Sequence, residues 1–136
     1  MKHKIWFDAQ YKIVREEIIG SFAAEDVGEY LAVTRQVLNG IKHRKILVDY
    51  SHASRRLYDS KQVRKMLIDG TVDLGYIDET VAILAADPVV ALQATAMAFG
   101  AKAKGKRVKV QWFEDEAEAI AWLKQEETVS EASGMV

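Results

Sequence analysis

Residues 48–63, VDYSHASRRLYDSKQV, gather the side-chain types that most often carry out chemistry in proteins. Asp49, Ser51, His52 and Ser54 supply the carboxylate, hydroxyl and imidazole groups of a Ser–His–Asp hydrolase or transferase. A catalytic triad is defined by geometry, and adjacent residues rarely aim at one another in the required way. The chain also has no Gly-x-Ser-x-Gly motif, which exposes the nucleophile in many hydrolases. We therefore assign no catalytic residue here and keep the hydrolase as an alternative.

The same stretch could instead carry a phosphorylation switch. A phosphate on Ser60 or Ser54 would lie near a predicted helix N-terminus, where backbone amides and the helix dipole favour negative charge. Basic side chains that could pair with that phosphate lie close by in the sequence: Arg55, Arg56, Lys61 and Arg64. The simpler interpretation is that Asp59 or Ser60 caps the helix, which stabilises it by about 1 kcal/mol.

The remaining polar residues do not predict a metal or nucleic-acid site. His3, His43 and His52 lack ligand spacing, and the absence of cysteine excludes sulfur-ligated zinc, a thiolate nucleophile and disulfides. The net charge is −1, and the basic runs at 42–45 and 55–56 are expected at opposite ends of one strand. We expect no metal, cofactor or nucleic-acid partner, and treat the basic run 102–109 as a solvated turn, with an anion-binding surface as the alternative.

Apolar patterns predict the elements that must position these residues. Continuous apolar runs in KILVDY and TVAILAA are typical of strands buried on both faces, and RVKVQW alternates as an edge strand does. Helical spacing and start signals, such as Asp87-Pro88, separate the strands. The predicted order is β-β-α-β-α-β-α-β-α. It indicates an α/β fold with a mostly parallel five-stranded sheet, about four helices and an antiparallel first strand.

The length of 136 residues predicts one domain, over residues 1–125. The polar, small-residue segment 126–136 is expected to be a flexible C-terminal tail. The N-terminal residues have no apolar stretch of signal-peptide length, and no run approaches the roughly 20 apolar residues of a membrane span. The chain is therefore expected to be cytoplasmic, with no integral membrane segment.

Three segments in this order resemble the SpoIIAA-like fold: KILVDYS, TVAILAADPV and WFEDEAEAIAWL. STAS domains and CRAL-TRIO-type lipid carriers share that fold, and the closer resemblance is to small bacterial SpoIIAA-like proteins that are largely uncharacterised. The resemblance extends over about residues 3–124. In STAS domains an Asp-Ser-Ser-Gly motif at a helix start carries the phosphate acceptor on its second serine. Asp59-Ser60 resembles the start of that motif, but Lys61 and Gln62 replace its last two residues, so the resemblance supports the fold more than the switch.

Together these observations favour a non-enzymatic, regulatory STAS-type module that binds a protein, a homodimer partner or a small ligand. Ligands of open α/β sheets bind at the carboxyl ends of the strands. The candidate binding residues are therefore those after the central strand: Asp49, Ser51, Ser54, Arg55, Arg56 and Tyr58, with Ser60 as the candidate phosphorylation site. The alternative is a carrier of a small apolar, lipid-like ligand in a pocket between helices and sheet. Ordinary core packing would equally explain the large apolar residues Trp6, Met66, Met97, Phe99, Trp112 and Trp122.

Overall fold

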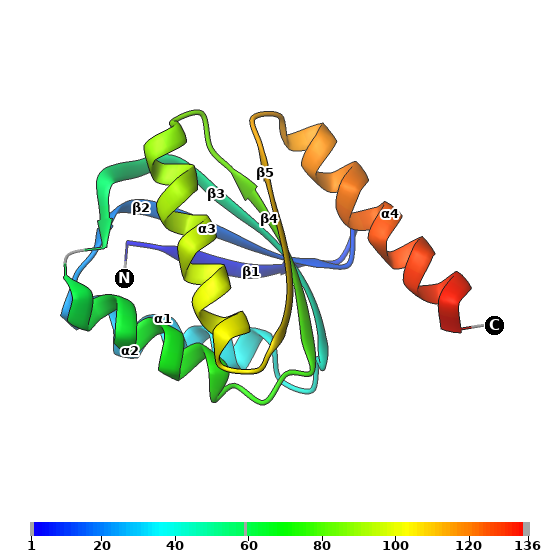
Figure 1. The fold of residues 1–136 in the computed structure, drawn as a ribbon, viewed down its shortest axis with the longest axis horizontal. Helices are drawn as coiled ribbons and strands as arrows, with labels where there is room; N and C mark the ends of the chain where they lie inside the picture. Colours follow the sequence, from blue (N-terminus) through cyan, green and yellow to red (C-terminus); the bar gives the residue numbers. More distant parts are fainter. Residues whose placement is uncertain (1, 59, 135–136) are drawn as a thin grey trace.

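The computed structural model describes residues 2–58 and 60–134, with side chains described to residue 125. Its elements follow the predicted order (Figure 1). They are β1 (Lys4–Asp8), β2 (Ile13–Phe22), α1 (Ala24–Val37), β3 (His43–Tyr58), α2 (Lys61–Val72), β4 (Asp78–Leu84), α3 (Pro88–Ala103), β5 (Arg107–Phe113) and α4 (Glu116–Gly134).

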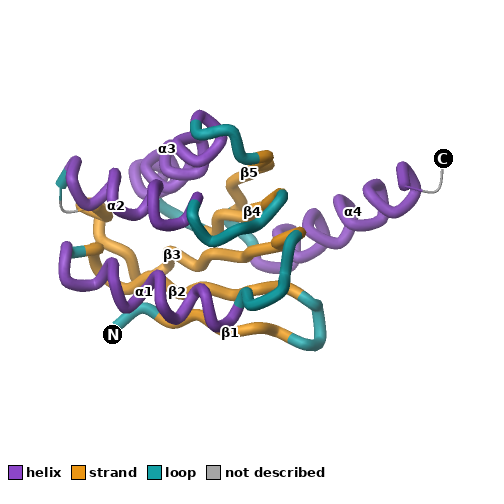
Figure 2. Tube along the Cα trace, turned by 90° about the horizontal axis from the view of Figure 1, so that it is seen from below, coloured by secondary structure: helices purple, strands orange, loops and turns teal. Residues whose placement is uncertain are grey.

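The five strands form one sheet in the order β1-β2-β3-β4-β5. β1 is antiparallel to β2 and the other neighbours are parallel, which confirms the predicted α/β architecture. Successive crossovers all step in the same direction, so right-handed connections place α1, α2 and α3 on one face of the sheet. The last helix, α4, packs on the other face and runs away from the rest of the molecule (Figures 1 and 2).

The two faces of the sheet carry separate apolar cores. Even-numbered residues of β2 and β3, such as Val14, Ile18 and Ile46, face α1–α3 and belong to the larger core. Ile13 and Leu47 face α4 and pack in a smaller cluster. This alternation follows from the two-residue period of a strand, and it determines which polar residues of the strands become buried under α1–α3.

Side-chain caps fix the starts of two helices near the predicted site. The Ser60 hydroxyl accepts a hydrogen bond from Val63 N at 3.2 Å, and Asp87 accepts one from Val89 N at 3.0 Å. α1 begins at Ala24. Its first turn is held by Asp26, whose carboxylate accepts from Ala23 N at 2.9 Å.

The third strand is longer than predicted. The sequence predicts a turn after Tyr50, but β3 continues to Tyr58. The reason is the length of β2, which keeps pairing with β3 through Ile19 with His52 and Phe22 with Tyr58. Two register shifts interrupt this pairing, so the segment bends while its backbone remains in the sheet.

The predicted boundary at residue 125 falls within α4, whose helical backbone is described to Gly134. The side chains of residues 126–134, and residues 135–136 altogether, lie outside the described part of the chain. The flexible tail therefore stays a prediction. Among the residues that the structure describes, no helix combines the length and apolar character that a membrane crossing requires.

Candidate functional site

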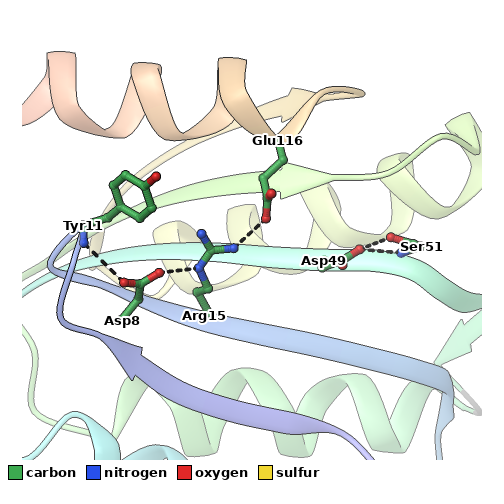
Figure 3. Close-up of polar contacts among 6 residues, drawn as sticks. All are labelled: Asp8, Tyr11, Arg15, Asp49, Ser51 and Glu116. Carbon is green, nitrogen blue, oxygen red and sulfur yellow. Dashed lines mark hydrogen bonds and ion pairs between the residues drawn. The ribbon is translucent and has the colours of Figure 1, made fainter.

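The structure separates the predicted site residues of β3 rather than gathering them. Asp49 and Ser51 lie on the face of the sheet that α4 covers, where the Asp49 carboxylate accepts hydrogen bonds from the backbone N–H and the hydroxyl of Ser51 (Figure 3). A triad would need an imidazole between these two groups, and the direct contact leaves no place for one. The Ser–His–Asp hydrolase stays a prediction, and this geometry gives it no support.

The other predicted residues serve three different contacts. The Arg55 guanidinium pairs with Asp87 at 2.7 Å, and the Ser54 hydroxyl accepts from Arg56 N at 3.0 Å. Ser60 caps α2, as the simpler interpretation of this serine predicts, and Asp59 lies outside the described residues. Partner binding and phosphorylation at these residues stay predictions.

Tyr58 is the exception, because it belongs to a buried polar cluster beneath α1–α3. Glu16 lies at the centre of this cluster, on the face of β2 that carries Val14 and Ile18. The Tyr30 hydroxyl donates a hydrogen bond to Glu16 Oε1 at 2.5 Å. Tyr50 and Tyr58 lie near the same carboxylate and interact through their hydroxyl groups.

An ion pair forms the other half of the cluster. Arg44 on β3 and Glu79 on β4 are register partners, and Arg44 Nη2 lies 2.9 Å from Glu79 Oε2. This distance makes an ion pair, but the N–H groups of Arg44 do not point at Glu79 Oε2. That oxygen therefore accepts no hydrogen bond from the described residues. The guanidinium stacks on the Tyr76 ring, 4.2 Å from its centre. Both members are buried, with 3% and 8% of their surfaces exposed.

Burial dominates the electrostatics of this cluster. Desolvation raises the pKa of Glu16 to about 7, although the hydrogen bond from Tyr30 and the charge of Arg44 oppose the shift. Desolvation also raises the pKa of Glu79, again against the charge of Arg44. The same cause raises the pKa values of Tyr30, Tyr50 and Tyr58, so these hydroxyls stay protonated and can donate hydrogen bonds.

The cluster lines a cavity of about 100 Å³ between the sheet and α1–α3. Its polar wall is formed by Glu16, Arg44, Glu79 and the tyrosines, and its apolar wall by side chains of α2 and α3, among them Leu67, Ile68, Met97 and Ala98. Arg44 Nε and Nη1 are buried in this wall and have no hydrogen-bond partner among the described residues. Buried donors are nearly always paired in folded proteins, so the protein's own hydrogen bonding is incomplete at these two nitrogen atoms.

A larger groove lies over the cavity, between α2 and α3. It has a volume of about 610 Å³ and shares Tyr58, Ile68 and Met97 with the cavity wall. Basic side chains border it: Lys61, Arg64, Lys65 and Lys104, against one acid, Asp69. The three shared side chains therefore separate the buried polar cluster from a surface groove with positive charge at its edge.

The sequence contained a signal for this cluster that the motif search missed. Glu16, Arg44 and Glu79 each occupy an inward-facing position of a strand, next in the two-residue period to inward-facing apolar residues. Buried charged residues are rare unless they are paired, so charges at core positions deserve the same weight as a recognised motif. The pairing of Arg44 with Glu79, however, depends on the register of β3 and β4, which the sequence alone does not give.

The described residues include no group of three or more His, Cys, Asp or Glu side chains that could hold a metal ion. The polar groups around the cavity are instead the carboxylates of Glu16 and Glu79, the guanidinium of Arg44 and several tyrosine hydroxyls. Such a set suits a hydrogen-bonded organic molecule better than a metal ion.

Comparison with known proteins supports the fold. No protein-family model matches the chain, and no curated protein matches it. A solved structure that is similar is an uncharacterised protein of the DUF3478 family with a SpoIIAA-like fold, from Shewanella loihica PV-4. It matches with a TM-score of 0.64 and 16% identity, over 89% of this chain and 91% of that one. The chain has the SpoIIAA-like fold. This confirms the resemblance inferred from the sequence, and at this identity it concerns the fold alone.

Proposed function

We propose that this protein is a non-enzymatic binding module that holds a small organic ligand between the sheet and α1–α3. The observation that carries the proposal is the buried Arg44, whose Nε and Nη1 lie in the wall of a cavity without a hydrogen-bond partner in the described part of the chain. A hydrogen-bond acceptor on the ligand would satisfy these donors. Glu16 and the tyrosine hydroxyls would bind other polar groups of the same molecule.

The shape of the site favours a ligand with a polar end and an apolar body. The polar end would lie against Arg44 and Glu16, and the body would pack on Ile68 and Met97 toward the groove. This modifies the purely apolar, lipid-like ligand of the alternative drawn from the sequence, because a fully apolar molecule would leave the buried polar groups unpaired. Of the residues predicted as binding residues, Tyr58 is the one that lines both spaces.

A regulatory surface formed by residues 49–60 is supported less well. Its exposed members include Arg56, but Arg55 is engaged by Asp87, and Asp49 and Ser51 by each other. A surface of this kind could recognise a protein without convergent side chains. The cavity is preferred because its groups do converge.

The test is the mass of the purified protein under native and then denaturing conditions. We expect a bound small molecule in the native spectrum that leaves on denaturation. The variant Ala98→Leu fills the cavity wall and should lose the bound mass, whereas Ala121→Leu, on the exposed side of α4, should keep it. A bound mass that survives Ala98→Leu unchanged would show that the ligand lies elsewhere, and a wild-type chain that carries no small molecule would contradict the proposal.

A further inference from the structure

The outer side of α3 is apolar although it faces solvent. Its inner side packs Val90, Ala91 and Ala94 into the core. The outer side presents Val89, Leu92 and Phe99 with 42%, 71% and 50% of their surfaces exposed. Ala96 and Ala103 are exposed between and after them. A helix that is apolar on every side is normally buried on every side, so this surface is expected to be covered in the working protein.

The spacing of these residues indicates what covers them. Positions 89, 92, 96, 99 and 103 are separated alternately by three and four residues, which is the a/d pattern of a coiled-coil seam. We propose that a second copy of this chain packs on this seam, with the two α3 helices antiparallel about a two-fold axis. The proposal is independent of the ligand in the cavity.

Side-chain sizes select the antiparallel arrangement. With the axis at residue 94, each a position meets a d position of the other copy. Phe99 then packs against the partner's Val89, and Leu92 packs against the partner's Ala96. Both of these layers pair a large side chain with a smaller one, as dense packing requires. Ala103 lies beyond them, because its counterpart at position 85 precedes α3. A parallel pair would place Phe99 on the partner's Phe99 and Ala96 on the partner's Ala96, alternating crowded layers with empty ones.

Charge at the ends of the helix favours the same arrangement. Two acidic residues, Glu114 and Asp115, follow the end of β5, on the side of the sheet where α3 begins. Asp87 lies at the same end, but its charge is balanced by Arg55. Basic residues lie where α3 ends and β5 begins: Lys102, Lys104, Lys106 and Arg107. An antiparallel pair brings the acidic end of one copy to the basic end of the other. The same end-to-end matching repeats at both ends, because a two-fold interface is self-complementary.

The proposal is tested on the full chain by sedimentation equilibrium from about 1 to about 300 µM, a range that detects micromolar dimers. The wild type should dimerise with increasing concentration. Leu92→Glu and Phe99→Glu should each weaken dimerisation at least about 30-fold, as expected for residues central to an interface. Ile77→Glu is the matched control, because Ile77 is also 50% exposed but lies outside α3. Circular dichroism and the melting temperature should show that both α3 variants remain folded.

The orientation is tested by reversing one charge. Lys102→Glu would place an acid against the acidic end of the partner and should weaken an antiparallel dimer several-fold in low salt. Arg35→Glu, on the exposed side of α1, makes the same change in net charge and should have no effect. A chain that stays monomeric across the whole range, or a dimer that is unaffected by Leu92→Glu, would overturn the proposal; in the first case the seam serves another partner or none.

Discussion

The two faces of the sheet use the same kinds of charged residue in opposite ways. On the α4 face, Arg15 binds Asp8 at 2.8 Å and Glu116 at 2.5 Å, and all three side chains keep some contact with solvent (Figure 3). On the α1–α3 face, Arg44 and Glu79 are buried, and two nitrogen atoms of Arg44 have no hydrogen-bond partner among the residues that the structure describes. On the α4 face, the paired charges connect secondary-structure elements. On the α1–α3 face, the buried charges are not needed to build a compact core.

This difference points to the function of each face. Arg15 connects the first hairpin to the start of α4, so its contacts are sufficient as a structural device. The buried pair carries a desolvation penalty that its imperfect alignment does not fully offset. Such a pair is easier to account for if it serves binding specificity. This is why the proposed ligand site lies under α1–α3 rather than under α4.

The largest expected effect separates the two arginines. Arg44→Met leaves Glu79 buried without its partner and should lower the free energy of unfolding by about 3–5 kcal/mol. Arg15→Met removes a partly solvated ion pair and should lower it by about 1 kcal/mol or less. Urea denaturation of both variants at pH 7 measures the two values.

A double variant checks the physical cause. Arg44→Met combined with Glu79→Met replaces both charges by apolar groups of similar volume and should recover most of the lost stability. If the double variant stays as unstable as Arg44→Met, packing on Tyr76 rather than charge burial is responsible. Equal losses for Arg44→Met and Arg15→Met would remove the contrast between the faces.

The next effect is a dependence on pH. The folded-state pKa of Glu16 is raised to about 7 by burial, above its unfolded value of 4.5. The folded chain therefore binds more protons between these pH values, and stability should fall as pH rises through them, by at most about 3 kcal/mol from this group. Glu16→Gln should flatten the decline between pH 5 and pH 8, as followed by chemical denaturation. Some decline should persist, since Glu79 shifts in the same direction.

The α4 face should respond to pH with the opposite sign. Partial desolvation would raise the pKa of Asp8, but hydrogen bonds from Arg15 and two backbone amides lower it overall. Its contribution is present above the unfolded value of 3.8 and is lost as pH falls through the lowered pKa. Asp8→Asn should therefore alter stability in acid and leave the Glu16 transition near neutral pH in place.

The outcome for Glu16→Gln checks the burial of this group. If the stability of that variant falls between pH 5 and pH 8 as much as that of the wild type, the Glu16 carboxylate is solvated.

Much of the architecture could be predicted from the sequence, because apolar periodicity reports directly on which strand faces are buried. The order of the elements, the parallel sheet and the antiparallel β1 follow from that signal. The extent of β3 does not, since residues 51–58 have a polar, turn-like composition. They form a strand because β2 is long enough to pair with them, which is a property of the partner and not of the segment.

The candidate site was harder to predict for a related reason. The motif-like residues Asp49, Ser51 and Ser54 are adjacent in sequence, but strand alternation and local hydrogen bonds direct them to separate contacts. Glu16, Arg44 and Glu79 are far apart in sequence and meet only through the sheet register. Tyr58 could be predicted as a site residue because it belongs to the motif-like segment 48–63. The structure shows that it also lines the cavity.

A smaller effect compares how the two faces accept added volume. Ala119 of α4 is fully buried against Ile13 and Leu47, so Ala119→Leu should overpack this cluster and lower the free energy of unfolding by about 1–3 kcal/mol. Ala98 of α3 borders the cavity, so Ala98→Leu should change stability by less than about 1 kcal/mol. Thermal and urea unfolding of the two variants measure the difference. A loss for Ala98→Leu as large as that for Ala119→Leu would mean that the cavity cannot take three extra carbon atoms.

The smallest expected effect concerns Gly100, where α3 passes close to α2. A Cβ at this position would lie 2.5 Å from Ile68 Cδ1, so that side chain would have to move. Ile68 lines both the cavity and the groove, so space lies on both sides of it. We expect the strain of Gly100→Ala to offset the helix propensity gained, about 1 kcal/mol, and leave stability nearly unchanged. Gly28→Ala meets no atom within 4 Å and should show the full gain. A loss above about 2 kcal/mol for Gly100→Ala would mean that Ile68 is fixed, and that this face is packed as tightly as the α4 face.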